Sequence, residues 1–222
     1  MFVEMIDLLR CPHPHADSWL VAAAARTVGR HVMDGTLGCP VCEAEYPIHD
    51  GIADFGPAPD AGVPGDEPGG SDAERAMRLA ALFGLTGPGG TVALGGRSGG
   101  DQGVVAALLA ELGGVRVLTL DAPAAPLTVD QLSGLRGGGG LPLAIGSLRA
   151  AALDARTADA PRLTAAVQAL APRGRLLAPA SAPLPAGVTE IARDDLQWLA
   201  ERDPSPVESR PVALQRRRGG AS

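Results

Sequence analysis

The sequence predicts an α/β fold whose main domain contains a parallel sheet, with a small cysteine- and histidine-bearing domain in front of it. Three observations support this prediction. All 3 cysteines and all 4 histidines lie before residue 57, residues 57–71 are rich in Pro, Gly and acid, and helical and strand patterns alternate from residue 72 onward. We therefore expect a small domain at 1–56, a linker at 57–71 and an α/β domain at 72–218.

Composition bounds the core and the partners. Hydrophobic residues make up 45% of the 222 residues and aromatic residues only 3%, so the core must consist mainly of Ala, Leu and Val. The net charge of −6 gives no overall attraction to nucleic acid. The basic cluster "LQRRR" at 214–218 is typical of a solvated chain end. We therefore do not expect a nucleic-acid partner.

Cysteine usage and apolar runs bear on location. Three cysteines cannot all pair within one chain, and two of them stand in a C-x-x-C, which favours a reducing compartment and a metal over disulfides. Residues 1–10 carry acids and no long apolar run, unlike a signal peptide. No stretch reaches the roughly 18 apolar residues of a membrane helix. We expect a cytoplasmic protein that does not enter the membrane.

The small domain contains the residue types of a zinc site. Cys39 and Cys42 form a C-x-x-C knuckle, and Cys11 supplies a third thiol. Either His13 or His15 can complete four ligands, and we favour His15 because C-x-x-x-H leaves room for the longer imidazole. The alternative is that Cys11 is a small core residue, that Cys39 and Cys42 are free or paired thiols, and that the histidines lie on the surface. A thioredoxin-like redox pair is disfavoured because this C-x-x-C does not open a helix after a strand. Between the halves, "DSWLVAAAARTVG" is expected to be a helix.

The same segments resemble a known family. "MIDLLRCP" and "GTLGCPVCEAEYPIHDGIADF" are similar to the Trm112-like zinc-ribbon proteins over residues 5–55. The sequence departs from that family at Pro14, where a cysteine often stands. The resemblance implies a binding module, because eukaryotic relatives activate methyltransferases by packing beside their sheet. The structural zinc itself is predicted from the donor residues Cys11, His15, Cys39 and Cys42.

In the expected α/β domain, Ser71 or Asp72 can cap a helix, "AERAMRLAALFGL", that ends at Gly84 or Gly87. The segments that follow alternate at lengths that imply right-handed crossovers and a parallel sheet. The expected strands are 91–96, 115–121, 149–155 and 174–180, and the expected helices are 101–114 and 161–172. At the end of the chain, "GVTEIARDDLQWLAER" and "PVALQRR" fit two antiparallel edge strands around the turn "DPSP".

The loop "TVALGGRSGGDQG", residues 91–103, is the second candidate site. Glycines between a strand and a helix allow dihedrals closed to other residues and let a ligand approach the backbone, while the helix N-terminus attracts an anion. Asp121 ends the next strand, 21 residues after Gly100, where an acid can hold ribose hydroxyls. In the dinucleotide pattern G-x-G-x-x-G, however, Arg97 takes the place of the middle glycine.

The downstream segments carry a second resemblance. "LPLAIGSLRAAALDA" and "APRLTAAVQALAPRGRLLAPA" are similar to class I S-adenosylmethionine-dependent methyltransferases of the ubiquinone-biosynthesis type, over about residues 75–218. The resemblance implies loop amides on the methionine carboxylate and Asp121 on the ribose. Cofactor-binding candidates are Gly95, Gly96, Arg97, Gly99 and Asp121. The sequence departs from the family at Arg97, at Gly139 and Gly140 where an adenine-binding acid is usual, and at Arg149.

These departures shape the functional expectation. We expect a methyltransferase-like protein with its own ribbon, with weakened or lost catalysis, that acts as a binding or assembly partner. One alternative is an active S-adenosylmethionine-dependent small-molecule methyltransferase in which Arg97 contacts the cofactor carboxylate. A second is an NAD-dependent Rossmann enzyme that uses Asp121 on the ribose. The sequence identifies no catalytic residue, and it leaves open the substrate, the protein partner and a homodimer.

Overall fold

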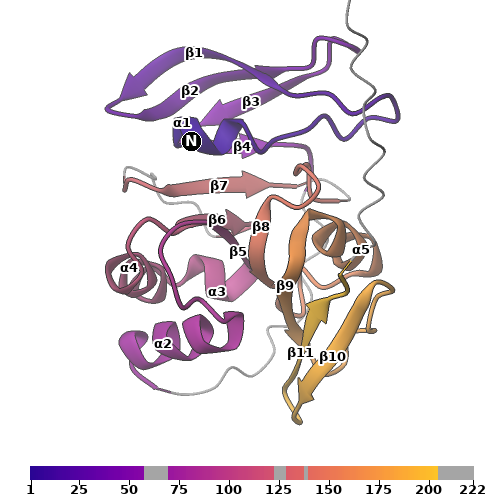
Figure 1. The fold of residues 1–222 in the computed structure, drawn as a ribbon. Coiled ribbons are helices and arrows are strands. Elements are labelled where there is room, and N and C mark those ends of the chain that lie inside the picture. Colours follow the sequence, from indigo (N-terminus) through magenta and orange to yellow (C-terminus); the bar gives the residue numbers. More distant parts are fainter. Residues whose placement is uncertain (58–69, 123–128, 138–139, 205–222) are drawn as a thin grey trace, which may run out of the picture.

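The computed structural model describes residues 1–57, 70–122, 129–137 and 140–204. Within these residues one 11-stranded sheet runs through the molecule in the order β1-β2-β3-β4-β7-β6-β5-β8-β9-β11-β10 (Figure 1). Most of the expected linker, at 58–69, and the basic cluster at 214–218 lie outside the described residues. No helix in the described part of the chain is long and apolar enough to cross a bilayer.

The N-terminal part is an antiparallel meander. It comprises helix α1 (Val3–Ile6) and strands β1 (Val21–Val28), β2 (His31–Gly38), β3 (Glu45–His49) and β4 (Ile52–Asp54). The helix expected in "DSWLVAAAARTVG" is therefore wrong, because its alanine run forms β1. Gly29 has a φ of 57° in the β1–β2 turn, and cross-strand pairing with β2 overrides the helical propensity of alanine.

The second part has a doubly wound strand order. Strands β5 (Thr91–Gly95), β6 (Arg116–Leu120), β7 (Leu132–Arg136), β8 (Leu148–Ala152) and β9 (Leu170–Pro179) lie parallel in the order β7-β6-β5-β8-β9. Counted from β5, this is 3-2-1-4-5, the Rossmann order with its switch point between β5 and β8. The predicted α/β fold with a Rossmann-like sheet is confirmed.

An antiparallel hairpin closes the far edge of the sheet. Strand β11 (Gln197–Arg202) pairs with β9 and with β10 (Val188–Arg193). Its turn is formed by Asp194, whose Oδ1 accepts hydrogen bonds from the amides of Leu196 and Gln197 at 2.8 Å each. The single strand expected in "GVTEIARDDLQWLAER" is therefore wrong, because this segment folds into both strands of the hairpin. The second half of the expected turn "DPSP" and all of the expected strand "PVALQRR" lie outside the described residues.

Helices cover the faces of the sheet. Helix α2 (Asp72–Phe83) has the expected N-cap at Ser71, in a capping box with Glu74, and ends at Gly84 in the left-handed conformation. The other helices are α3 (Gly96–Gly100), α4 (Gln102–Glu111) and α5 (Ala160–Ala169). Figure 1 shows α2, α3 and α4 together on one side of the sheet and α5 on the other.

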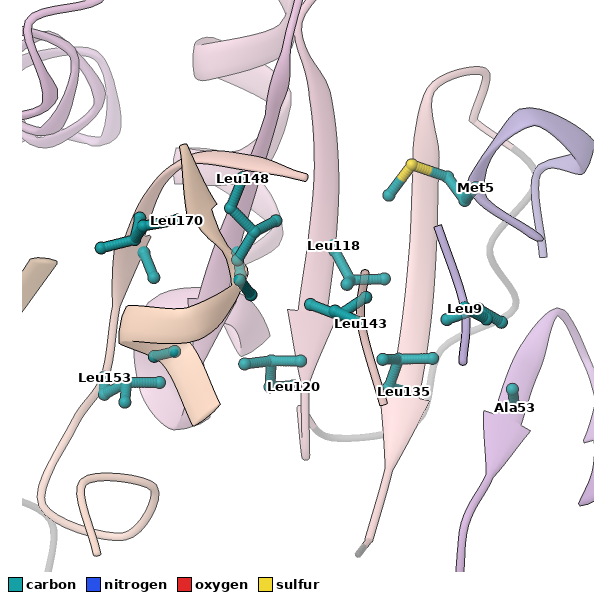
Figure 2. Packing of buried hydrophobic residues seen from close by; sticks show 14 of the residues in the cluster. Met5, Leu9, Ala53, Leu118, Leu120, Leu135, Leu143, Leu148, Leu153 and Leu170 are labelled. Carbon is teal, nitrogen blue, oxygen red and sulfur yellow. The ribbon is translucent and has the colours of Figure 1, made fainter. Parts of the chain in front are cut away.

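The N-terminal part is continuous with the second part in both sheet and core. Strand β4 pairs in parallel with β7, Ile52 opposite Gly134. Met5 and Leu9 are fully buried in the cluster that also holds Leu118 and Leu135, and Figure 2 shows these side chains close together. The first residues of the chain thus cover part of the face of the α/β sheet.

Candidate functional site

The fold brings the four predicted metal ligands together. The ligand atoms of Cys11, His15, Cys39 and Cys42 all lie within 4.8 Å of one another. The Sγ atoms of Cys11 and Cys42 are 3.6 Å apart, and Cys39 Sγ is 3.4 Å from His15 Nε2. Four tetrahedral zinc ligands at about 2.3 Å for sulfur and 2.1 Å for nitrogen have edges of about 3.8 Å between sulfurs and about 3.6 Å between sulfur and nitrogen. The donor set therefore fits zinc.

The imidazole ring of His15 is oriented as a zinc ligand requires. Its Nδ1 lies 2.6 Å from the carbonyl oxygen of Ala16, so Nδ1–H donates to that oxygen and Nε2 faces the sulfurs. This hydrogen bond, together with the neighbouring Cys11 thiol, raises the pKa of His15. The other candidate, His13, places Nδ1 3.4 Å from Cys42 Sγ, at the rim of the group.

The knuckle favours a thiolate at Cys39, which is 3% exposed. Burial alone would raise the pKa of Cys39, but backbone amides of Cys42 and Val41 donate to its sulfur, and with the neighbouring thiols they lower the pKa to about 6. Sequence reasoning missed Tyr46, whose hydroxyl lies 3.5 Å from Cys11 Sγ. Burial, followed by the Cys11 contact, raises the pKa of Tyr46 and keeps its hydroxyl protonated.

The glycine loop is packed against the chain's own atoms. A Cβ on Gly95 would lie 2.5 Å from Thr157 Oγ1, and a Cβ on Gly99 would lie 2.2 Å from the carbonyl oxygen of Leu94. Gly96 has a φ of 57°, and its Cβ would lie 2.0 Å from the Asp154 carboxylate. The glycines are thus explained by neighbouring side chains and backbone. The expected open loop is instead the short helix α3, Gly96–Gly100, with Gly95 as its N-cap.

Asp154 fills the space beside the loop. One carboxylate oxygen accepts from the amide of Arg97 at 3.0 Å, and the other accepts from the amides of Arg156 and Thr157 at 3.1 Å each. The Thr157 hydroxyl donates to the same oxygen at 2.8 Å. Because Asp154 follows β8 and the loop follows β5, this carboxylate sits at the topological switch point, where open α/β sheets bind ligands.

Asp121, the acid predicted to bind a ribose, also contacts other groups of the chain. Its Oδ2 lies 2.5 Å from Nη2 of Arg162, and its Oδ1 accepts from the amide of Gly137 at 2.7 Å. The Arg162 side chain is 2% exposed and the Asp121 side chain 12%. Arg162 comes from α5, after β8, so the pair spans the carboxyl end of the sheet beside β5.

Two cavities lined by described residues contain different members of the predicted cofactor set. Arg97 lines a cavity of about 300 Å³ between α2 and the ends of β8, β9 and β11. Gly99 lines another cavity, of about 350 Å³, beside α4, β6 and β7. Asp121 belongs to neither lining.

Comparisons with known proteins give similarities of fold at low identity. No family model matches the chain, and no curated protein sequence does. Solved structures similar to it include a geranyl diphosphate methyltransferase in complex with GPP and sinefungin (18% identity, TM-score 0.40, 48% of this chain and 43% of that chain). Another is in the complex that contains the Haloferax volcanii Trm112 methyltransferase activator (23%, 0.36, 48% and 54%). A third is an S-adenosylmethionine-dependent methyltransferase from Aquifex aeolicus (15%, 0.41, 60% and 89%).

The first two of these matches cover only about half of the proteins compared, 43% and 54% of their lengths. At these identities and TM-scores they do not assign a function. The functional argument therefore depends on the side chains of the two candidate sites.

Proposed function

We propose that this chain is a methyltransferase-like protein that has lost cofactor binding and acts as a binding or assembly partner, with an N-terminal unit held by structural zinc. The observation that carries the proposal is the Asp154 carboxylate beside Gly96. It occupies the amide of Arg97, which the methionine carboxylate of a cofactor would need.

Displacing Asp154 is unfavourable for two reasons. A cofactor carboxylate at the same amide would place two anions side by side. Moving the aspartate away would break its hydrogen bonds to the amides of Arg156 and Thr157 and to the Thr157 hydroxyl, and each bond to a charged group contributes about 1.5–3 kcal/mol. The same contacts disfavour the nicotinamide alternative, because a dinucleotide phosphate would meet the same carboxylate.

The N-terminal unit supports an architectural role. Its strand β4 completes the β7 edge of the α/β sheet, and the amide of Phe2 donates to the hydroxyl of Ser133 at 2.9 Å. The chain therefore supplies within itself the kind of partner that the ribbon resemblance implies. We retain residues 1–56 and 72–218 as the two proposed units.

Zinc is the metal that the N-terminal donor set suits. Cys11, His15, Cys39 and Cys42 would hold it, and the ion would cross-link the first segment of the chain to the β2–β3 knuckle. We expect one zinc per chain in elemental analysis of the purified protein. A protein that carries no zinc, purified without chelator, would contradict this part of the proposal.

Calorimetric titration with S-adenosylmethionine and with S-adenosylhomocysteine tests the loss of cofactor binding. We expect no heat of binding at millimolar ligand. Micromolar binding of either compound would overturn the proposal and favour the active methyltransferase, with Arg97 beside the 300 Å³ cavity as its first residue to test.

A further inference from the structure

We propose that the Arg162 guanidinium takes the place of a ribose at Asp121. By pairing with this carboxylate it blocks a site that could otherwise bind a nucleoside. This inference rests on the proposed loss of cofactor binding. It adds the residue responsible at the ribose end, whereas Asp154 acts at the glycine loop.

The first argument is the place of the ion pair in the fold. Asp121 follows β6 at the carboxyl edge of the parallel strands, where this class of sheet binds its ligands. A carboxylate there can accept hydrogen bonds from two ribose hydroxyls. In this chain Oδ2 instead faces Nη2 of Arg162 at 2.5 Å and Oδ1 accepts from the Gly137 amide at 2.7 Å, so both carboxylate oxygens already have partners within the chain.

The second argument is that Arg162 is held in position by its helix. Its backbone amide donates to the N-cap side chain of Asp159 at 2.9 Å, and its Nε lies 3.8 Å from the other oxygen of that carboxylate. The first turn of α5 therefore fixes the base of the side chain. The guanidinium then lies between two carboxylates, with the Asp121 contact the shorter by a wide margin.

The third argument is energetic. An arginine that is 2% exposed has lost most of its hydration, and Asp121 compensates for it at close range. Removing either partner alone leaves a buried charge without its counter-ion, which costs about 3–5 kcal/mol, whereas replacing both by neutral groups of similar volume is nearly neutral. Opening the site to a ribose has to break this pair first, so the pair acts as a competitor inside the same chain.

A double-mutant cycle tests the pair. Asp121→Asn keeps an oxygen for the Gly137 amide, and Arg162→Met keeps the volume of the side chain. We expect each single variant to lower the folding equilibrium constant about a hundredfold or more, and the double variant to recover most of that loss. Arg173→Ala, at an exposed position, is the control. Additive effects of the two substitutions would overturn the inference, whatever the wild-type protein does with cofactor.

A binding experiment tests the latent site. We expect millimolar adenosine, which has no carboxylate for Asp154 to exclude, to raise the melting temperature of Arg162→Ala but not of wild type. The rise should disappear in Arg162→Ala combined with Asp121→Asn. An Arg162→Ala protein that unfolds cooperatively and gains no ligand-dependent shift would overturn the latent site. Binding to wild type would instead overturn the proposed function, while the mutant cycle would still decide the role of Arg162.

Discussion

Replacing Leu9 by alanine tests whether the N-terminal segment is an integral part of the α/β core. Leu9 is fully buried, and its backbone bridges to Leu143 on the loop before β8. Its neighbours on both sides are tied to the same loop, since Arg10 N donates to Pro142 O at 2.9 Å and Ala144 N donates to Leu8 O at 2.8 Å. The segment cannot move away without breaking these bonds, so a cavity at Leu9 would collapse only in part.

Leu9→Ala should therefore cost about 3–5 kcal/mol of unfolding free energy, the upper part of the range for buried leucines. Val3→Ala is the matched control, because Val3 is 39% exposed on α1 and should cost well under 1 kcal/mol. Urea unfolding is followed by tryptophan fluorescence in a Trp19→Phe background, which leaves Trp198 as the single tryptophan. Trp198 is fully buried on β11 at the far side of the sheet, so its signal reports on the α/β part.

The refuting result is specific. If Leu9→Ala leaves the midpoint of the Trp198 transition unchanged, then the N-terminal segment does not contribute to the stability of the α/β sheet. The proposal that the N-terminal unit acts as an internal partner of the α/β sheet would then be refuted. A single cooperative transition that moves to lower urea is the expected result.

Three further perturbations follow from the structure. Gly96→Ala should destabilise the fold by about 1–3 kcal/mol more than Gly29→Ala. Both glycines have a φ of 57°, but only at Gly96 does the Asp154 carboxylate lie where the added Cβ would stand. Equal losses of unfolding free energy in chemical denaturation would contradict this. Cys39→Ser should reduce zinc measured by elemental analysis to well below one per chain, whereas His49→Ala, outside the cluster, should retain it; full zinc in the serine variant would exclude the proposed site. Burial would raise the pKa of Asp101, but hydrogen bonds from the Val104 amide and from Arg75 outweigh it and lower the pKa. The ionised Asp101 therefore stabilises the fold above the pKa of a free aspartate, and this stabilisation is lost as the pH falls from there to the lowered pKa of the folded state. Asp101→Asn should lose less unfolding free energy than wild type below about pH 4, and an identical acid dependence of the two proteins would refute this.

Local signals predicted much of the α/β part. The capping box at Ser71 and the left-handed Gly84 delimit α2 as expected, because both act within one turn of the chain. The buried strands β5, β6 and β8 are short apolar runs between turn residues, which is the pattern of strands covered on both faces. The ligand spacing of the N-terminal unit likewise predicted which four side chains the fold brings together.

Other elements depend on contacts that no local pattern encodes. Strand β7 reads "LSGLR", and the hydroxyl of its fully buried Ser133 accepts a hydrogen bond from the amide of Phe2, 131 residues earlier in the chain. The alanines of β1 favour a helix by propensity, and pairing with β2 decides otherwise. The sequence pattern places Asp121 at a strand end, where the structure has it directly after β6, but its partner Arg162 lies 41 residues away, on a helix whose packing sets the contact.

The central claim is that the chain's own side chains occupy the crevice where a nucleotide cofactor would bind. A crystal structure of the wild-type protein grown with millimolar S-adenosylhomocysteine tests it most directly. The account predicts that Arg162 stays on Asp121, that Asp154 stays on the Arg97 amide, and that no ligand lies at the carboxyl ends of β5 and β6. A bound S-adenosylhomocysteine with its ribose on Asp121 and Arg162 turned away would contradict it.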